Sequence, residues 1–455
     1  MLLSLAQSDR AAFSPPDAGD GWSTLDQIVS TLTLQAGFNT SIVVVGTTLL
    51  GLAAGIIGVF ALLRRRALVC DALSHATLPG MALAFITAAV LGADGRTLPV
   101  LLSGAAVSGV LGVLAIQLIL RCTRLREDAA IGIVLSVFFG IGIVLLSVIQ
   151  QMPTGNAGGL RQFIYGQTAA MSVGDAVLMG AIALLACLAT VLLLKEFAVV
   201  CFNDAFARVS GWPVSLVDLG IMALVVLVTV AGLQAVGLLL VVAMLIVPPV
   251  AARFWTERLW LLVIVAGVIG GLSGYLGAAT SALLPRKPAG GVIVLTSGVI
   301  FVISMVCAPA RGVLAASWRR FRLRLRIAGE HILEEAFEHR GGDGQASLSA
   351  AQLRALATLR GWPRGLRRML VSLLRLRGHL TATPEGGVVL TPQGHTAGAR
   401  ISRNHRLWEQ YLISYADIAP SHVDWSVDQV EHVLSESLVR ELEAALRDAG
   451  TEVPA

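Results

Sequence analysis

An aspartate and a histidine lie four positions apart in the first long apolar segment of the chain, which reads ALVCDALSHATLPGMALAFITAAV from residue 67. Positions i and i+4 of a helix share one face, so Asp71 and His75 are expected one turn apart. A charge at the centre of a bilayer costs roughly 2.5–3.5 kcal/mol on insertion scales. Carboxylate and imidazole are also good ligands for divalent first-row metals. The pair predicts a path for a polar solute, with a structural pair that locks two helices together as the alternative.

The composition around this pair is that of a membrane protein. The 455 residues are 55% hydrophobic and 14% charged, with a mean hydropathy of +0.77, which is too apolar for an ordinary soluble domain. Apolar runs of about 18–25 residues are long enough to cross a bilayer core of about 30 Å, and in lipid they must be helices. The expected spans are 41–63, 68–92, 98–120, 129–150, 174–194, 216–233, 236–252, 259–283 and 290–308. The short seventh run contains Pro248 and Pro249, so it can also be re-entrant, which leaves eight spans.

Basic residues predict how the chain crosses the membrane. Arginines follow the first span at 64–66 and the last span at 319–326, and cytoplasmic segments attract Lys and Arg. We therefore expect a multi-pass membrane protein whose C-terminal part is cytoplasmic. Glycines recur within the spans, for example at 51, 55 and 58 and at 267, 270, 271 and 274, and small residues let membrane helices pack closely.

The connection between the fifth and sixth spans, residues 195–218, is long and of mixed polarity. Its sequence predicts a short amphipathic helix over 203–209, ended by Gly211 and Pro213. Long connections tend to be functional, although this one can also be a plain connector.

Three segments resemble the manganese/zinc/iron permease family of ABC transporters. They are CDALSHATLPG from Cys70, FNDAFARVSGWPV from Phe202 and VGLLLVVAMLIVPPVAARF from Val236. The resemblance covers about residues 35–310. It implies an all-α polytopic domain of the type II ABC importer kind that imports a divalent cation, with manganese first and zinc or iron as alternatives. It also implies a location in the bacterial inner membrane and a metal pathway past Asp71 and His75.

The same resemblance implies the partners. These are separate ATPase subunits, an external metal-binding protein and a second permease subunit, either another copy or a related chain. The chain has no GxxxxGK[ST] phosphate loop, so it is expected to be a transport subunit and not an enzyme. Contact with the ATPase is assigned by resemblance to Phe202, Asn203, Asp204, Ala207, Arg208 and Gly211.

Charge density rises after residue 307. Residues 311–400 hold 15 Arg and 6 acidic residues, and residues 401–455 hold 4 Arg and 10 acidic residues. This shift indicates a soluble region with two parts. The expected domains are an N-terminal segment (1–38), the permease domain (39–310), a basic linker (311–327), a winged-helix domain (328–400) and a helical metal-binding and dimerisation domain (401–455).

The predicted winged helix consists of helices over 330–339, from 349, and over 364–377, followed by a hairpin around 385–387. In this layout the second helix of the helix-turn-helix enters the DNA major groove. That helix carries Arg364, Arg367, Arg368 and Arg375, which can contact DNA or anionic lipid, or form a solvated face.

The C-terminal segments NHRLWEQYL and VDQVEHVLSESLVREL resemble the diphtheria toxin repressor family of metal-dependent regulators. The resemblance implies a regulatory Mn²⁺ or Fe²⁺. Its ligands would be His331, Asp428, Glu431 and His432, a second set His405 and Glu409, and Asp424 as a further candidate. The i, i+3 and i+4 spacings place Asp428, Glu431 and His432 on one helix face, and His405 and Glu409 repeat this spacing. Oxygen and imidazole donors favour manganese or iron(II). Ordinary charge pairing on a helix surface is the alternative.

Three functions are compatible with these features. The first is a permease subunit with a cytoplasmic metal-sensing domain. The second is a membrane-tethered, metal-dependent DNA-binding regulator. An intramembrane metalloenzyme is the third, but the chain has no HExxH motif, and Asp71 and His75 alone supply too few ligands and no general base.

Overall fold

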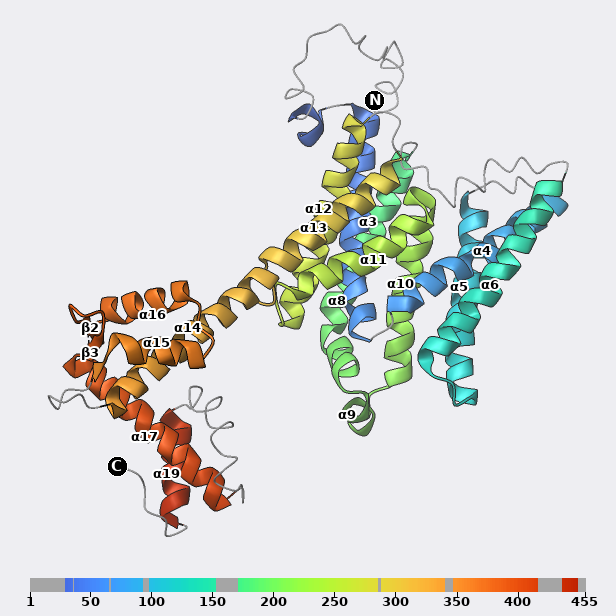
Figure 1. Cartoon of the computed structure of the whole chain (residues 1–455). Helices are drawn as coiled ribbons and strands as arrows, with labels where there is room; N and C mark the ends of the chain where they lie inside the picture. The colour runs from blue at the N-terminus through green and yellow to red at the C-terminus, as the bar shows by residue number, and fades with distance from the viewer. Residues whose placement is uncertain are drawn as a thin grey trace, which may run out of the picture. The chain divides into compact units, whose positions relative to one another are not determined.

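The computed structural model describes residues 29–35, 37–64, 67–92, 98–152, 171–284, 288–339, 347–415 and 436–448. By its internal contacts the chain divides into two compact units, residues 1–315 and 316–455. Long apolar helices build the first unit, and shorter helices with a small sheet build most of the second (Figure 1).

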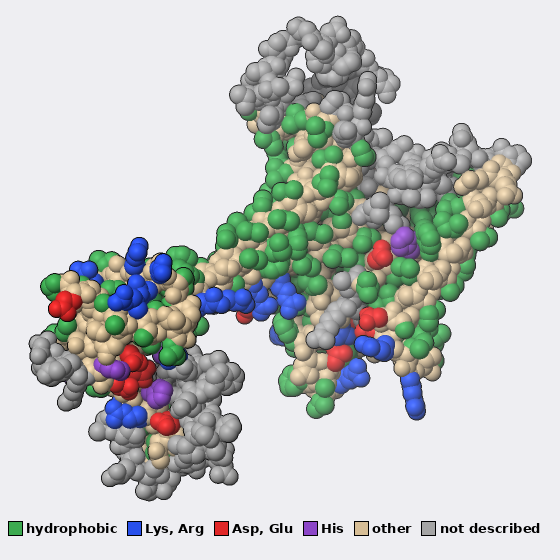
Figure 2. Space-filling view, viewed as in Figure 1, with side chains coloured by type: hydrophobic (Ala, Val, Ile, Leu, Met, Phe, Trp, Pro, Cys, Tyr) green, Lys and Arg blue, Asp and Glu red, His purple; other side chains and the backbone are tan. Residues whose placement is uncertain are grey.

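Eight helices among the described residues are long and apolar enough to cross a membrane. They are α3 (Phe38–Leu63), α4 (Ala67–Val90), α5 (Leu98–Cys122), α6 (Glu127–Gln151), α8 (Val173–Phe202), α10 (Val214–Val236), α12 (Leu259–Leu283) and α13 (Ala289–Cys307). The expected seventh span is α11 (Leu238–Arg253), whose 16 residues reach only about 24 Å at 1.5 Å per residue. Hydrophobic side chains cover much of the visible surface of these helices (Figure 2).

Glycines allow the membrane helices to pack closely, as the sequence predicts. Helix α3 packs against α8, α11 and α12. A Cβ atom on Gly51 of α3 would lie 2.2 Å from the carbonyl oxygen of Gly270 in α12, a distance that backbone atoms do not tolerate. Helix α4 packs against α5 and α6, and a Cβ on Gly80 would lie 2.1 Å from the carbonyl oxygen of Gly104. These close approaches fix α4, which carries Asp71 and His75.

The second unit has the element order of a winged helix followed by helices. Its elements are α14 (Val313–Glu338, from residue 316 onward), β1 (Ser347–Leu348), α15 (Ala350–Leu359), α16 (Arg364–Leu376), β2 (Leu380–Ala382), β3 (Val388–Leu390), α17 (Pro392–Tyr415) and α19 (Glu436–Asp448). The strands form an antiparallel sheet in the order β1-β3-β2, with Leu348 opposite Val388. Strands β2 and β3 are the predicted hairpin, and Gly386 takes a φ of 79° in its turn.

Helix α14 begins at residue 313 rather than at 330, where the sequence placed its start, and it runs through the predicted linker. The segment 313–326 is rich in Leu, Ala and Arg, which are strong helix formers. The core of this unit joins Ile332 of α14, Leu353 of α15, Leu370 of α16 and Val388 of β3. Helix α15 begins at the capping box of Ser349.

Candidate functional site

Asp71 and His75 lie one turn apart, in the second and third turns of α4. Their Oδ1 and Nε2 atoms lie 3.6 Å apart, which is longer than a hydrogen bond. Two ligands about 2.1 Å from a shared tetrahedral ion would lie about 3.4 Å apart, close to the observed separation. The Asp71 side chain is 41% exposed and that of His75 is 23% exposed, so the pair lies at the surface of the single chain. This geometry fits two donors to one cation.

His75 keeps unused hydrogen-bonding capacity. Its ring packs edge-to-face on Phe139 of α6, with centroids 4.9 Å apart. Its Nδ1 atom is buried and has no hydrogen-bond partner within the described residues. The neighbouring hydroxyl groups do have partners: Ser74 donates to the carbonyl of Cys70 at 2.8 Å, and Thr77 donates to that of Ser74 at 2.7 Å. Since buried polar atoms are normally satisfied, the imidazole is the exception on this face of α4.

The pair does not form a complete metal site on its own. Among the residues that the structure describes, no three His, Cys, Asp or Glu side chains are grouped so as to hold one ion. A dehydrated divalent ion needs at least four ligands. Asp71 and His75 alone offer fewer donors than such an ion needs.

The connection after α8 forms the predicted short helix. Helix α9 (Asp204–Val209) begins after Asn203, whose Oδ1 accepts a hydrogen bond from the Phe206 amide at 3.0 Å. Ala207 is buried, whereas Phe206 is 59% and Val209 is 89% exposed. The exposed Phe202 and Arg208 lie on or beside this helix, and Gly211 follows it with a φ of 80°. The helix thus presents apolar side chains on its outer face.

A buried arginine ties α9 to the ends of two membrane helices. Arg64 follows α3, its side chain is only 11% exposed, and its Nη1 donates to the Val200 carbonyl at 3.0 Å. Its guanidinium also binds Asp218 of α10 at 3.1 Å and contacts Asp204 of α9. In the sequence, Arg64 served only to orient the chain across the membrane, and its ion pairs were not predicted. Asp218 could have suggested them, because it is the only charged residue in the sequence of α10 and therefore needs a partner.

In the second unit, a glutamate that we did not predict lies between two predicted histidines. One Glu334 oxygen lies 3.3 Å from Nδ1 of His405 in α17, and the other lies 3.7 Å from Nδ1 of His331 in α14. The Glu334 side chain is 13% exposed and that of His331 is 6% exposed. The i, i+3 spacing of His331 and Glu334 was the signal that could have identified it.

The other predicted cytoplasmic ligands are only partly placed. Glu409 lies one turn after His405 on α17. Four further candidates lie outside the described residues: Asp424, Asp428, Glu431 and His432.

Helix α16 is amphipathic. Leu370 and Leu374 are buried in the core of the second unit. The predicted basic residues lie on the remaining surface: Arg364, Arg368 and Arg375 are exposed and Arg367 is half-buried. A solvated basic face is compatible with contact to a polyanion.

Two families match the chain. Residues 39–308 match the ABC 3 transport family, and residues 391–452 match the metal binding and dimerisation domain of iron dependent repressors. The first match contains α3 to α13, with the Asp71–His75 pair and α9. The second contains α17, with His405 and Glu409, and α19.

Similar proteins of known name span one or both regions. The chain is 43% identical over 300 residues to the manganese transport system membrane protein MntC of Bacillus subtilis, covering 66% of this chain and 68% of that protein. It is 41% identical over 283 residues to the zinc transport system membrane protein TroC of Treponema pallidum, covering 62% and 93%. A Chlamydia trachomatis protein named "Probable metal transport system membrane protein" is 27% identical over 411 residues and aligns with 86% of this chain, so its match extends beyond the permease region.

A solved structure supports the same assignment. The structure of PsaBC from Streptococcus pneumoniae in complex with Fab aligns with a TM-score of 0.55 and 28% identity, covering 66% of this chain and 100% of that chain. The family match, the apolar helices and the alignment with PsaBC concern the same part of the sequence. The chain therefore belongs to the ABC 3 transport family, and on its C-terminal side residues 391–452 are similar to the metal binding and dimerisation domain of iron dependent repressors.

Proposed function

We propose that the chain is the permease subunit of an ABC importer for divalent metal cations, with manganese as the first candidate cargo. Zinc and iron are the alternatives. The relatives with the names of manganese and zinc transport proteins support this cargo class. The single observation that carries the proposal is the Asp71–His75 pair of α4, with its 3.6 Å separation and an imidazole nitrogen that lacks a partner within the described residues.

The exposure of the pair favours a pathway between two permease subunits. Each chain would present one carboxylate and one imidazole, and two copies or two related chains would supply four donors to an ion that has lost its water. Such a site has to bind the cation well enough to admit it and weakly enough to release it. An external binding protein would deliver the ion to the pair.

We assign the ATPase contact to α9 and its flanks. Phe202, Phe206 and Val209 expose apolar surface, and Arg208 adds a charge beside it. Movement of α9 would reach the membrane helices through Arg64, which binds Asp204 of α9 and Asp218 of α10. A separate ATPase subunit would supply the energy by closing and moving this helix.

We place the second unit in the cytoplasm and assign it a metal-sensing role. The arginines at 319–326 follow the last membrane helix, as cytoplasmic segments do. Glu334 contacts His331 on its own helix and His405 on α17, and carboxylate and imidazole donors suit Mn²⁺ or Fe²⁺. Since the three side chains are not grouped closely enough to hold an ion by themselves in the described structure, Glu409, Asp424, Asp428, Glu431 and His432 would supply further donors to the regulatory ion. The bound ion would supply positive charge that links α14 to α17, and so report the metal level to the permease.

The test is metal uptake by the complete transporter with His75→Ala. We expect this variant to assemble normally and to lose accumulation of radioactive Mn²⁺, because one of two donors is removed. Thr87→Val on the same helix is the control, since the Thr87 hydroxyl bonds only to carbonyls of its own helix. Normal uptake by His75→Ala would refute the pathway role of the pair.

A second candidate function is a membrane-tethered, metal-dependent DNA-binding regulator. The observation that favours it is the exposed arginine face of α16 within a winged-helix arrangement. The full chain in detergent, with and without Mn²⁺, would be titrated with fluorescent duplex DNA. Metal-dependent binding that is lost in Arg364→Gln and Arg368→Gln would favour this function, and its absence would leave the regulatory permease.

A further inference from the structure

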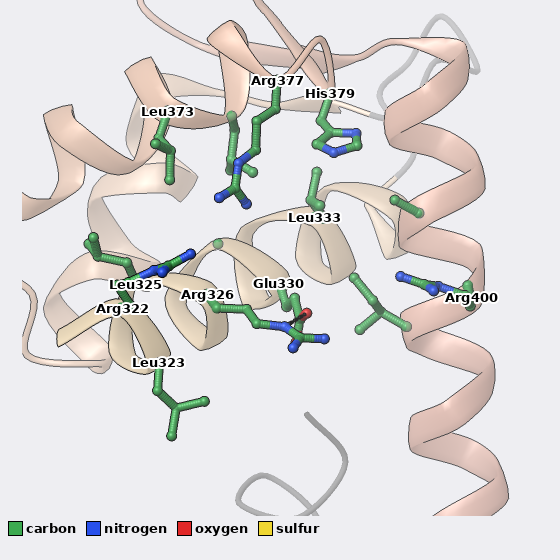
Figure 3. Close-up of a pocket in the computed structure, with 14 residues that line it drawn as sticks. Arg322, Leu323, Leu325, Arg326, Glu330, Leu333, Leu373, Arg377, His379 and Arg400 are labelled. Carbon is green, nitrogen blue, oxygen red and sulfur yellow. Dashed lines mark hydrogen bonds and ion pairs between the residues drawn. The ribbon is translucent and has the colours of Figure 1, made fainter. Parts of the chain in front are cut away.

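The second unit contains a cavity of about 460 Å³ whose polar lining is mostly cationic. It lies among α14, the end of α16 with the turn that follows it, and α17 (Figure 3). Its polar lining consists of Arg322, Arg326, Glu330, Arg377, His379 and Arg400. Leucines form most of the remaining wall, together with Gly329, Ala397 and Ile401. Ligand pockets of this size, about 300–1,000 Å³, hold small organic molecules.

The cavity holds more positive than negative charge. Its one carboxylate, Glu330, accepts a hydrogen bond from Arg326 Nε at 2.9 Å and neutralises that arginine. Within the described part of the chain, Arg322, Arg377 and Arg400 have no carboxylate partner. Figure 3 shows Arg322 and Arg377 directed from two elements toward the same space, with Arg400 across the cavity from them. Guanidinium groups that line one cavity without a carboxylate partner require an anion or water beside them.

The backbone holds the rim of this cavity in place. After α16, Gly378 adopts a φ of 74°, which turns the chain between Arg377 and His379. The His379 amide donates to the Leu374 carbonyl at 2.9 Å, and the His379 carbonyl accepts from the Thr391 amide at 3.1 Å. The ring nitrogen Nδ1 of His379 is buried and lacks a hydrogen-bond partner among the described residues. A fixed backbone with an unsatisfied imidazole is a second sign of a missing ligand, independent of the arginines.

We propose that this cavity binds a phosphate-bearing small molecule or headgroup. Guanidinium groups match phosphate oxygens in pairs, and a doubly charged phosphate uses three of them better than a carboxylate can. The leucine-lined wall leaves room for an attached organic group. A soluble phosphate ester and the headgroup of an anionic lipid share this chemistry. Arg322 follows the last residue of α13 by only fifteen positions, so the lipid source is within reach of the chain.

The experiment uses the purified full chain without its ATPase and has two arms. In the first, inorganic pyrophosphate and AMP are titrated calorimetrically into the chain in neutral detergent. In the second, the chain is reconstituted in nanodiscs of phosphatidylcholine with or without phosphatidylglycerol, and retained lipid is read by native mass spectrometry. Binding in the first arm identifies a soluble ligand, and retention of phosphatidylglycerol identifies a lipid.

Two variants with a matched control decide whether this cavity is responsible. Arg322→Gln and Arg377→Gln should each weaken binding about tenfold or more, because a hydrogen bond to a charged group is lost. Arg324→Gln is the control, since Arg324 lies two positions away on the same helix and does not line the cavity. Thermal melting of each variant checks folding, and ligand should raise the melting temperature of the wild type but not of Arg377→Gln.

Three results would overturn the proposal. They are absence of binding in both arms, wild-type binding by Arg322→Gln and Arg377→Gln, or equal weakening by Arg324→Gln, which would indicate attraction to overall charge. The proposal is independent of metal import, because none of these readouts measures metal uptake.

Discussion

Two groups of ionisable side chains lie only seven positions apart in the membrane unit and differ in how fully their polar atoms are paired. The Arg64 side chain is only 11% exposed and binds two carboxylates and a backbone carbonyl. Asp71 and His75 are partly exposed, share one contact of 3.6 Å, and leave His75 Nδ1 without a partner in the described structure.

This difference indicates that Arg64 and its partners form a structural ion cluster, whereas we propose that Asp71 and His75 form a binding site. A buried charge is tolerated when its partners compensate the loss of water, and Arg64 has such partners. The α4 pair gains little from its own contact, and we therefore propose that it binds a passing ligand. A substitution of Arg64 should accordingly lower stability, and a substitution in the α4 pair should lower transport.

The largest effect is expected from Asp71→Asn, which keeps the size of the side chain and removes its charge. Uptake of Mn²⁺ should fall by about 100-fold or more, because loss of even an outer-shell partner costs 10–100-fold at metal sites. The melting temperature should change by less than about 3 °C, since an exposed ion pair contributes roughly 0–1 kcal/mol. Radioactive uptake and thermal melting are measured on the same preparations. A large loss of stability with retained uptake per folded molecule would erase the contrast between the two groups.

Arg64→Gln should have the opposite profile. It leaves Asp218, whose side chain is 9% exposed, without its cation, and breaking a buried ion pair costs about 3–5 kcal/mol. The measurement is the thermal stability of the assembled transporter. Adding Asp218→Asn should recover part of the loss, because the uncompensated charge is then gone. Arg258→Gln, at an exposed position, is the control. Wild-type stability of Arg64→Gln would show that the cluster is not structural.

The third group to compare is His331, Glu334 and His405 of the second unit. It has the same donor types as the α4 pair, but its carboxylate is less exposed. Glu334→Gln should weaken Mn²⁺ binding to the full chain by about tenfold or more, since Glu334 lies between His331 and His405. Mn²⁺ titration by electron paramagnetic resonance measures this. Glu335→Gln is the matched control, because Glu335 is adjacent and contacts only His339 in the described structure. Equal weakening by both variants would contradict a specific site.

The sequence predicts most elements here because their signals are local. Apolar runs locate the membrane helices, Asn203 and Gly211 delimit α9, and Ser349 marks the start of α15. The start of α14 was wrong by 17 residues, because arginines that indicated a linker are also good helix formers. The roles of Arg64 and Glu334 were missed for another reason. Arg64 binds Asp218, 154 positions away, and Glu334 contacts His405 on α17, and no local pattern indicates such pairs. The local i, i+3 spacing to His331 indicated Glu334 only as a neighbour on the same helix.

The smallest effect concerns α9, the element that Arg64 connects to the membrane helices. Asn203→Ala removes the N-cap of this six-residue helix and should cost about 1 kcal/mol. Amide exchange at Phe206 should then become about fivefold faster, because 1 kcal/mol corresponds to about a factor of five. Asn203→Asp keeps an acceptor oxygen and should behave as the wild type. Global stability should hardly change, because Arg64 still binds Asp204 and Asp218. If Asn203→Ala instead destabilises the whole chain as much as Arg64→Gln does, then α9 and the Arg64 cluster unfold as one unit. The structural cluster would in that case include α9, which is the proposed ATPase contact.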